Sequence, residues 1–194
     1  MDKKQEILDA AYMLFSEKGY SLSMSEISQA VHIKTPSLYS HFKSKDEIIE
    51  LTVKAEIERY FNMLFEKTAA LANLSCEKKL RCLFFLVIEY YNDNRRLRFW
   101  HHISLLQQKQ LQSMRGLIKS HNTFLVDAVR SCFQKGVAQK EIRENITEGA
   151  LYLYFSMLQG FLDIMQFHLD DEILIENQAA MVWAAYWNGI KLTQ

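Results

Sequence analysis

Apolar residues recur at helical spacing along most of the chain, and nowhere do they alternate cleanly as they would in a strand. The first predicted helix, residues 3–18, is followed by a glycine that favours a helix end. Its apolar face consists of Ile7, Leu8, Ala11, Leu14 and Phe15. The same periodicity predicts longer helices near 75–93, 95–107, 109–138, 146–168 and 171–190. The pattern therefore predicts an all-α protein.

Two short helices follow the first one. A capping box opens the earlier of them, with Ser23 as the cap and Glu26 three residues later. Thr35 is predicted to cap the second short helix, and Pro36 then occupies its first position, where the missing N–H of proline costs nothing. Two short helices joined by a tight turn and flanked by longer ones predict a helix-turn-helix unit.

A longer helix carries the chain out of this unit. A second capping box, the stretch SKDE at 44–47, opens it, and its pattern continues to about residue 71 without a flexible linker. We therefore predict two domains whose boundary lies inside this helix: a helix-turn-helix domain over 1–50 and a larger helical domain over 51–194.

Composition supports a globular helical protein that stays inside the cell. Hydrophobic residues make up 49% of the chain, whereas one proline and six glycines supply few turns for a β-rich fold. The longest uncharged apolar run has nine residues, 179–187, which is too short to span a membrane. The three cysteines form no C-x-x-C pair and no export signal precedes them, so we expect reduced thiols, a cytoplasmic location and no membrane association.

The second short helix has an unusually polar outward face. If Leu38 and Phe42 point inward, a step of about 100° per residue turns Pro36, Ser37 and Ser40 outward and places Tyr39 and His41 on the flanks. A face of small residues and hydroxyls suits close approach to the base edges of a DNA major groove.

Local charge agrees with this interpretation, although the global charge is zero. No acidic residue occurs from 27 to 45, where Lys34, Lys43 and Lys45 can neutralise phosphates. Residues 1–54, however, hold seven lysines against eight acids, and the first arginine is Arg59, so bidentate arginine–guanine contacts are not available here. Periodicity alone therefore favours a DNA-reading helix and a solvated helical corner equally.

The stretch SLSMSEISQAVHIKTPSLYSHFKSKDEIIEL resembles the N-terminal DNA-binding region of the TetR (tetracycline-repressor) family of bacterial transcriptional regulators. The most specific part is the string L-Y-x-H-F-x-x-K, and the upstream ILDAAYMLFSEKGY is similar to the family's first helix. The resemblance covers about residues 5–51. The rest of the chain agrees with the family only in length and helical character.

The resemblance implies a DNA-contacting role for nine residues, to which the local charge adds Lys34. Residues at the start of the first short helix and at the start of the long helix would lie near phosphates, and those of the second short helix near bases. They are Ser23, Ser25, Thr35, Pro36, Ser37, Tyr39, Ser40, His41 and Lys45. The chain departs from the family at three positions: His32 replaces a glycine in the turn, Ser28 replaces an alanine and Ser40 replaces an aromatic residue.

The last two helices, 146–168 and 171–190, are apolar on nearly all sides. They would form either the core of a monomer or, as the resemblance implies, a four-helix interface of a two-fold dimer. The predicted interface residues are Leu151, Phe155, Leu158, Leu162, Ala180, Trp183, Ala184 and Trp187. A dimer would hold two recognition helices roughly 34–36 Å apart, or a multiple of that, on a palindrome.

Candidate chemistry in the larger domain is sparse. An apolar cavity with a few polar groups is the usual small-molecule site, and the candidates for it are Trp100, His121 and Tyr154. A histidine or aromatic residue on an apolar helix face is, however, more often part of the core. No catalytic, phosphate-binding or zinc-binding motif is present, so we predict no enzyme activity, no cofactor and no metal.

These features together predict a homodimeric, ligand-responsive transcriptional regulator. It would act as a repressor that an unknown small-molecule effector releases from a palindromic double-stranded DNA operator. The alternative is an all-α dimeric protein that binds small molecules or other proteins and lacks specific DNA binding.

Overall fold

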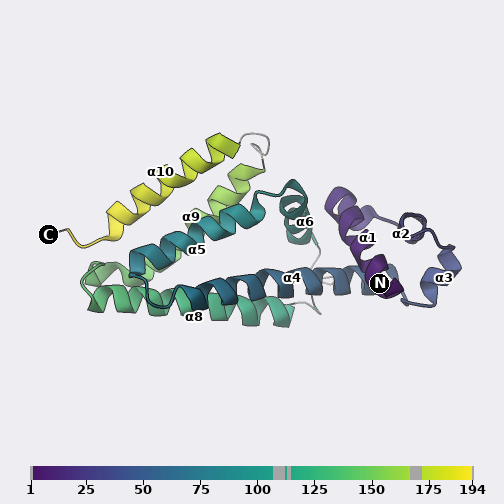
Figure 1. Ribbon diagram of the computed structural model, residues 1–194, viewed down its shortest axis with the longest axis horizontal. Coiled ribbons are helices and arrows are strands. Elements are labelled where there is room, and N and C mark those ends of the chain that lie inside the picture. Colours follow the sequence, from purple (N-terminus) through teal and green to yellow (C-terminus); the bar gives the residue numbers. More distant parts are fainter. Residues whose placement is uncertain (1, 107–111, 113–114, 167–171, 194) are drawn as a thin grey trace. The chain divides into compact units, whose positions relative to one another are not determined.

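The computed structural model describes residues 2–106, 112, 115–166 and 172–193 (Figure 1). Within these ranges the regular elements are helices, which confirms the all-α class. They are α1 (Lys3–Lys18), α2 (Met24–Ala30), α3 (Thr35–Tyr39), α4 (Lys45–Ala70), α5 (Cys76–Tyr91), α6 (Asn94–Ser104), α8 (Arg115–Ala138), α9 (Thr147–Met165) and α10 (Glu172–Ile190), with 3₁₀ turns at Gly19–Ser21 and Glu144–Ile146. The predicted helices 95–107, 109–138, 146–168 and 171–190 lie partly outside the described residues.

Contacts between residues divide the chain into two compact units. Unit 1 comprises residues 1–62 and 94–120, and unit 2 comprises residues 63–93 and 121–194. Helix α4 contributes residues up to Asn62 to unit 1 and residues from Met63 onward to unit 2. The division into a DNA-binding domain over 1–50 and a ligand-binding and dimerisation domain over 51–194 stays a prediction.

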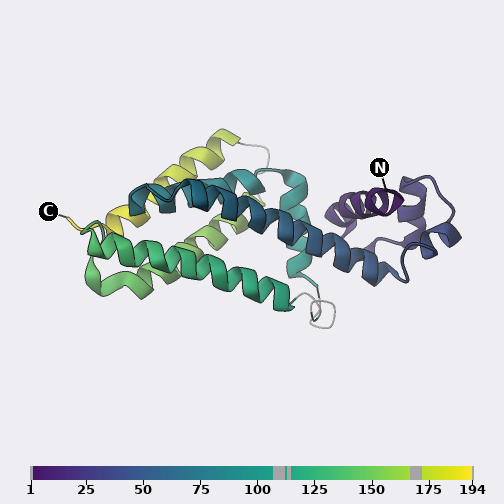
Figure 2. The same ribbon diagram turned by 60° about the horizontal axis from the view of Figure 1, so that its bottom comes forward.

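In unit 1, helix α6 packs against α1, although some 80 residues separate them in the chain (Figure 2). The ring of Phe99 lies 4.7 Å from the ring of Tyr12 and 5.1 Å from that of Phe15, between centroids. Gly19 closes α1 with a φ of 57°, and a methyl group there would lie only 2.6 Å from Nδ1 of His102. Glycine therefore serves both the backbone conformation and the close approach of α6.

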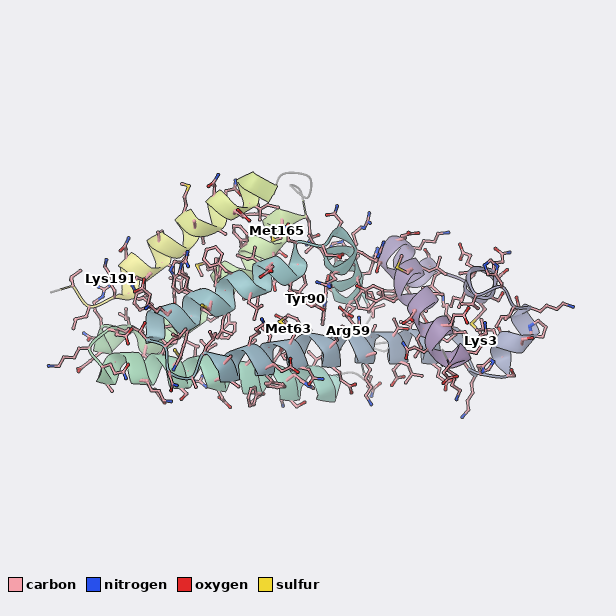
Figure 3. All side chains as sticks on the ribbon, viewed as in Figure 1. Lys3, Arg59, Met63, Tyr90, Met165 and Lys191 are labelled. Atoms are coloured by element: carbon pink, nitrogen blue, oxygen red, sulfur yellow. The ribbon has the colours of Figure 1, made fainter. Side chains whose placement is uncertain are left out.

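In unit 2, helices α5, α9 and α10 share an aromatic core, and side chains fill the space between their ribbons (Figure 3). Phe84 of α5 lies 5.9 Å from Trp183 of α10 and 6.1 Å from Phe161 of α9, between ring centroids. Two buried tyrosine hydroxyls donate to backbone carbonyls of neighbouring helices: Tyr154 to Leu80 at 3.0 Å, and Tyr186 to an α9 carbonyl at 2.8 Å. Their hydrogen bonds fix the three helices in register.

The end of α10 is fastened to the segment that follows α8. Ile142 and Lys191 form an isolated antiparallel bridge. On either side of it, the backbone N–H of Arg143 donates to the carbonyl of Ile190 at 3.2 Å and that of Leu192 donates to the carbonyl of Glu141 at 2.9 Å. Among the described residues, no helix is both long enough and apolar enough to cross a membrane.

Candidate nucleic-acid interface

The first short helix begins as its sequence predicts. The N–H of Glu26 donates to Oγ of Ser23 at 3.2 Å, and the N–H of Ser23 donates to a Glu26 carboxylate oxygen at 2.8 Å, so the predicted capping box is confirmed. Lys18 at the end of α1 lies 2.5 Å from the same carboxylate. The hydrogen bond from Lys18, followed by those from Ser23, lowers the pKa of Glu26 to about 2. The carboxylate therefore stays charged as the cap requires.

Two of the three departures from the family, His32 in the turn between α2 and α3 and Ser28 in α2, fit the local structure. His32 has a φ of 54°, a conformation that glycine adopts most easily and that histidine also tolerates. Ser28 is buried, and its hydroxyl lies 2.9 Å from both the carbonyl of Ser25 and the hydroxyl of Thr35. The serine in place of the family's alanine thus ties α2 to the start of α3.

That bond also corrects the predicted start of α3. The cap is Lys34, which makes no side-chain capping bond, while Thr35 is the first helical residue and Pro36 the second. The reason is that the hydroxyl of Thr35 lies against Ser28 across the turn and does not bond to the backbone of its own helix. Proline is tolerated at this position as well, because the first-turn N–H groups of a helix have no partner within it.

Helix α3 ends at Tyr39, so Phe42 lies beyond it, in the residues that lead to α4. Together these residues turn the apolar side chains inward and leave polar ones in solvent, as the sequence predicts. Leu38 is fully buried and Phe42 is 4% exposed. The opposite side is open, with Tyr39 54% exposed. Exposed positions among the predicted DNA contacts are Ser23, Ser25, Lys34, Pro36, Ser37, Tyr39 and Ser40, whereas Thr35, His41 and Lys45 are half-buried.

The hydroxyls on this side fall into two groups. Three are already occupied: Ser23 in the capping box, Thr35 on Ser28, and Ser40 on the carbonyl of Ser37 at 2.6 Å. Among the described residues the hydroxyls of Ser25, Ser37 and Tyr39 make no hydrogen bond. These three have their full capacity for an external partner.

The lysines divide in the same way. Nζ of Lys45 donates to the carbonyl of Tyr20 at 2.9 Å and lies 4.1 Å from the centre of its ring, so this residue also holds the start of α4 against the end of α1. Lys34 and Lys43 form no ion pair within the described part of the chain. Lys43 lies in the acid-free stretch 27–45, and this local excess of positive charge is the sequence signal that identifies it as a candidate phosphate contact.

Half of the predicted dimer residues are core residues of unit 2. Leu151, Leu158, Trp183 and Trp187 are less than 9% exposed in the single chain, because α9 and α10 turn these side chains toward α5 and toward each other. Phe155 and Leu162 are half-buried, and Ala180 and Ala184 are exposed. Assignment of these eight residues to an interface stays a prediction.

Helices α9 and α10 nevertheless leave apolar side chains uncovered. Tyr152 is 78% exposed, Leu153 51% and Ile164 48% on α9, and Met181 is 72% exposed on α10. Ala180 and Ala184, one and three positions from Met181 on α10, are also exposed. We call these six residues the α9–α10 face. Periodicity did not identify this face because the sequence of α9 is apolar on nearly all sides.

The three predicted ligand residues lie in different surroundings. Trp100 belongs to unit 1, where its ring lies 5.7 Å from that of Tyr60. His121 and Tyr154 belong to unit 2; His121 is half-buried, with its ring 6.3 Å from that of Phe65, and Tyr154 is 2% exposed. Their role in binding a ligand stays a prediction. Among the described residues, no cluster of three or more His, Cys, Asp or Glu side chains could hold a metal.

Known proteins resemble this chain most clearly in the segment that holds α2 and α3. The family described as "Bacterial regulatory proteins, tetR family" matches residues 7–52. The biofilm operon icaADBC HTH-type negative transcriptional regulator IcaR of Staphylococcus aureus strain Newman is 32% identical over 123 residues, which are 63% of this chain and 64% of IcaR. The chain thus spans slightly less than two thirds of the length of the curated relatives it matches.

Solved structures agree over nearly the whole chain. A TetR-family transcriptional regulator from Mesorhizobium loti superposes with a TM-score of 0.74 at 22% identity, over 97% of this chain and 96% of that one. The ketosteroid transcriptional regulator KstR2 of Mycobacterium tuberculosis superposes with a TM-score of 0.75 at 15% identity, over 98% and 95%.

Residues 7–52 carry the N-terminal DNA-binding segment of the TetR family.

The TetR match and the polar face of α3 coincide. Residues 7–52 contain the capping box, the turn at His32, all of α3 and the start of α4. Every residue predicted to contact DNA lies in this segment, including Lys43 and Lys45. The fold of the remaining residues is that of TetR-family structures, at identities that support the fold alone.

Proposed function

We propose that this protein is a homodimeric transcriptional repressor that binds a palindromic DNA operator through α3 and releases it when a small molecule binds. One observation carries the proposal. The solvent side of α3 and its flanks, within the TetR-family segment, hold hydroxyls and lysines that have no side-chain partner among residues 2–106, 112, 115–166 and 172–193.

The partition of polar groups defines how the operator would be read. Ser37 and Tyr39 on α3 would meet bases or the adjoining backbone, Ser25 at the start of α2 would meet a phosphate, and Lys34 and Lys43 would neutralise phosphates. Lys45 would contribute chiefly by fixing α4, because its ammonium group is already held by Tyr20. Since residues 1–54 contain no arginine, specificity would rest on hydroxyls, apolar contact and DNA shape.

The α9–α10 face supports the dimer. The large apolar side chains of this face are at least 48% exposed on two neighbouring helices, and apolar patches on a protein surface mark interaction sites. Ala180 and Ala184 next to Met181 would let a second copy of α10 approach closely. A two-fold dimer would present two α3 helices to the two halves of a palindrome.

A repressor role is suggested by IcaR, which is named a negative regulator. The proposed response to a small molecule rests on the predicted ligand residues Trp100, His121 and Tyr154. A structure of the protein with its effector bound would test whether these residues contact it. Absence of enzyme activity and a cytoplasmic location stay predictions.

Fluorescence anisotropy with the DNA that precedes the protein's own coding sequence tests the proposal. We expect sequence-dependent binding in the nanomolar range, about 10⁻⁸ M or tighter, that weakens steeply with salt. Equal affinity for the upstream DNA and a shuffled duplex would contradict it and would favour a binding protein without specific DNA recognition. Size-exclusion chromatography with light scattering on the same sample tests the dimer.

A further inference from the structure

Two cysteines from distant parts of the chain meet inside unit 2. Cys76 is the first residue of α5 and Cys132 lies in α8, and their sulfur atoms are 3.2 Å apart. Both residues are buried, at 3% and 9% exposure, and both thiols are free. A disulfide bond is about 2.05 Å long, so closure requires a shortening of only about 1.2 Å.

The backbone on both sides is built to bring them together. A methyl group at Gly136, one turn after Cys132, would lie 2.9 Å from both Cβ and Sγ of Cys76, so the missing side chain is what lets α5 approach α8 here. The carboxylate of Glu141 accepts hydrogen bonds from the N–H groups of Cys76 and Glu77, at 3.2 and 3.3 Å. The start of α5 is thereby fixed beside α8.

Small molecules can reach the pair. Two pockets open to solvent, of about 410 and 180 Å³, are both lined by Cys132, Lys79 and Lys135, and the larger one is also lined by Cys76. A water molecule occupies roughly 30 Å³ in the liquid, so a small hydroperoxide has ample room. Two lysines beside a thiol are the kind of electropositive surroundings in which reactive cysteines lie.

The electrostatics distinguish the two sulfurs. The hydrogen bond between the two thiols, together with Lys79 and Lys135, lowers the pKa of Cys132 despite its burial and the nearby charge of Glu141. The same hydrogen bond, together with burial, raises the pKa of Cys76. Cys132 is therefore the better nucleophile, and Cys76 stays protonated until it reacts with the oxidised Cys132.

We propose that Cys76 and Cys132 form an oxidant-reactive dithiol, with hydroperoxides as the substrate class and an intramolecular disulfide as the product. The thiolate of Cys132 attacks one oxygen of hydrogen peroxide, the O–O bond breaks, and the products are Cys132 sulfenic acid and hydroxide. The sulfur of Cys76 then attacks the sulfenic sulfur, loses its proton, and water leaves. In sum, two thiols and one peroxide yield one disulfide and two waters.

The test uses the full chain with Cys82→Ser, because Cys82 is exposed and would react independently. The reduced protein is treated with hydrogen peroxide at pH 7, and free thiols and cross-linked peptides are measured over time. We expect loss of both thiols, a Cys76–Cys132 peptide, and a rate roughly tenfold or more above that of glutathione. A rate equal to that of glutathione, or thiol loss without the cross-linked peptide, would overturn the proposal.

Three variants in the same background separate the roles. With Cys76→Ser, a sulfenic acid on Cys132 should accumulate and be trapped by dimedone, whereas Cys132→Ser should give neither disulfide nor trapped product. Lys79→Ala with Lys135→Ala should slow oxidation roughly three- to tenfold, because each pKa unit changes the thiolate fraction up to about tenfold. Unchanged rates would refute the role of the lysines. Every readout is chemical, so failure here leaves the proposed DNA binding untouched.

Discussion

Two exposed regions of this chain, the solvent side of α3 and the α9–α10 face, differ in what the fold leaves without a partner. On α3 and its flanks the uncovered groups are hydroxyls and ammonium groups, and the apolar Leu38 and Phe42 are buried. On α9 and α10 the uncovered groups are Tyr152, Leu153, Ile164 and Met181. Polar groups without partners suit phosphates and base edges, whereas an apolar surface is most stable against another apolar surface. Under the proposed function, the first surface would meet nucleic acid and the second another copy of the protein.

The largest effect is expected from a charge on the apolar face. Met181→Glu should weaken self-association roughly 100-fold or more, because a dimer would bury two unpaired carboxylates. Sedimentation equilibrium measures the loss, and DNA affinity should fall with it. Gln134→Glu, at an exposed position of α8, is the matched control. Unchanged self-association of the Met181 variant would remove the α9–α10 face from the interface.

A smaller effect is expected from the aromatic residue on the polar face. Tyr39→Ala should weaken operator binding by about 1–3 kcal/mol, or roughly 10- to 100-fold, with self-association unchanged. Because Tyr39 is 54% exposed, the free energy of unfolding should change by no more than about 0.5 kcal/mol. Anisotropy titrations and urea unfolding measure the two quantities, with Met13→Ala on α1 as the control. Marked destabilisation would identify Tyr39 as a structural residue.

Removal of a single unpaired charge should cost less and act on every sequence alike. Lys34→Ala should weaken binding to operator and to shuffled DNA by the same factor, and reduce the slope of log affinity against log salt by about one. Lys54→Ala, an exposed lysine further along α4, serves as the control. An effect confined to the operator would mean that Lys34 reads bases.

The smallest effect concerns the packing that supports α1. Burial, and then the charges of His101 and Arg98, lower the pKa of His102, so the unfolded chain takes up a proton more readily than the folded one. The free energy of unfolding should therefore decrease as pH falls through about 6.5, and His102→Gln should reduce this decrease. Urea titrations at about pH 7.5 and 5 measure it. His101→Gln should reduce the decrease less than His102→Gln does, because His101 acts on His102 only through its charge. Equal pH dependence in wild type and both variants would contradict the assignment.

Much of the local structure was accessible from sequence. Helix α1 spans the predicted 3–18, α4 ends within one residue of the predicted position, and the capping box at Ser23 forms as expected. Periodicity and capping are local properties, since they depend on residues three or four positions apart. The start of α3 was missed by one position because its deciding contact, Ser28 with Thr35, crosses the turn.

Contacts between distant residues were not accessible. Nothing in the sequence pairs Lys45 with Tyr20, Cys76 with Cys132, or α6 with α1. The apolar face of a helix also does not show which neighbouring helix will cover it. The sequence therefore did not show that Leu151 and Trp183 are buried within the single chain, and their place in an interface stays a prediction.

The sequence by itself determined the helices, the helix-turn-helix and which face of α3 is polar, because hydrogen bonds and side-chain spacing within a helix are set by near neighbours. Tertiary structure alone decided which hydroxyls and lysines remain available, which apolar residues stay uncovered, and that two thiols separated by 56 residues lie in contact. These outcomes depend on packing between helices, where each group's surroundings are supplied by residues far away in the chain.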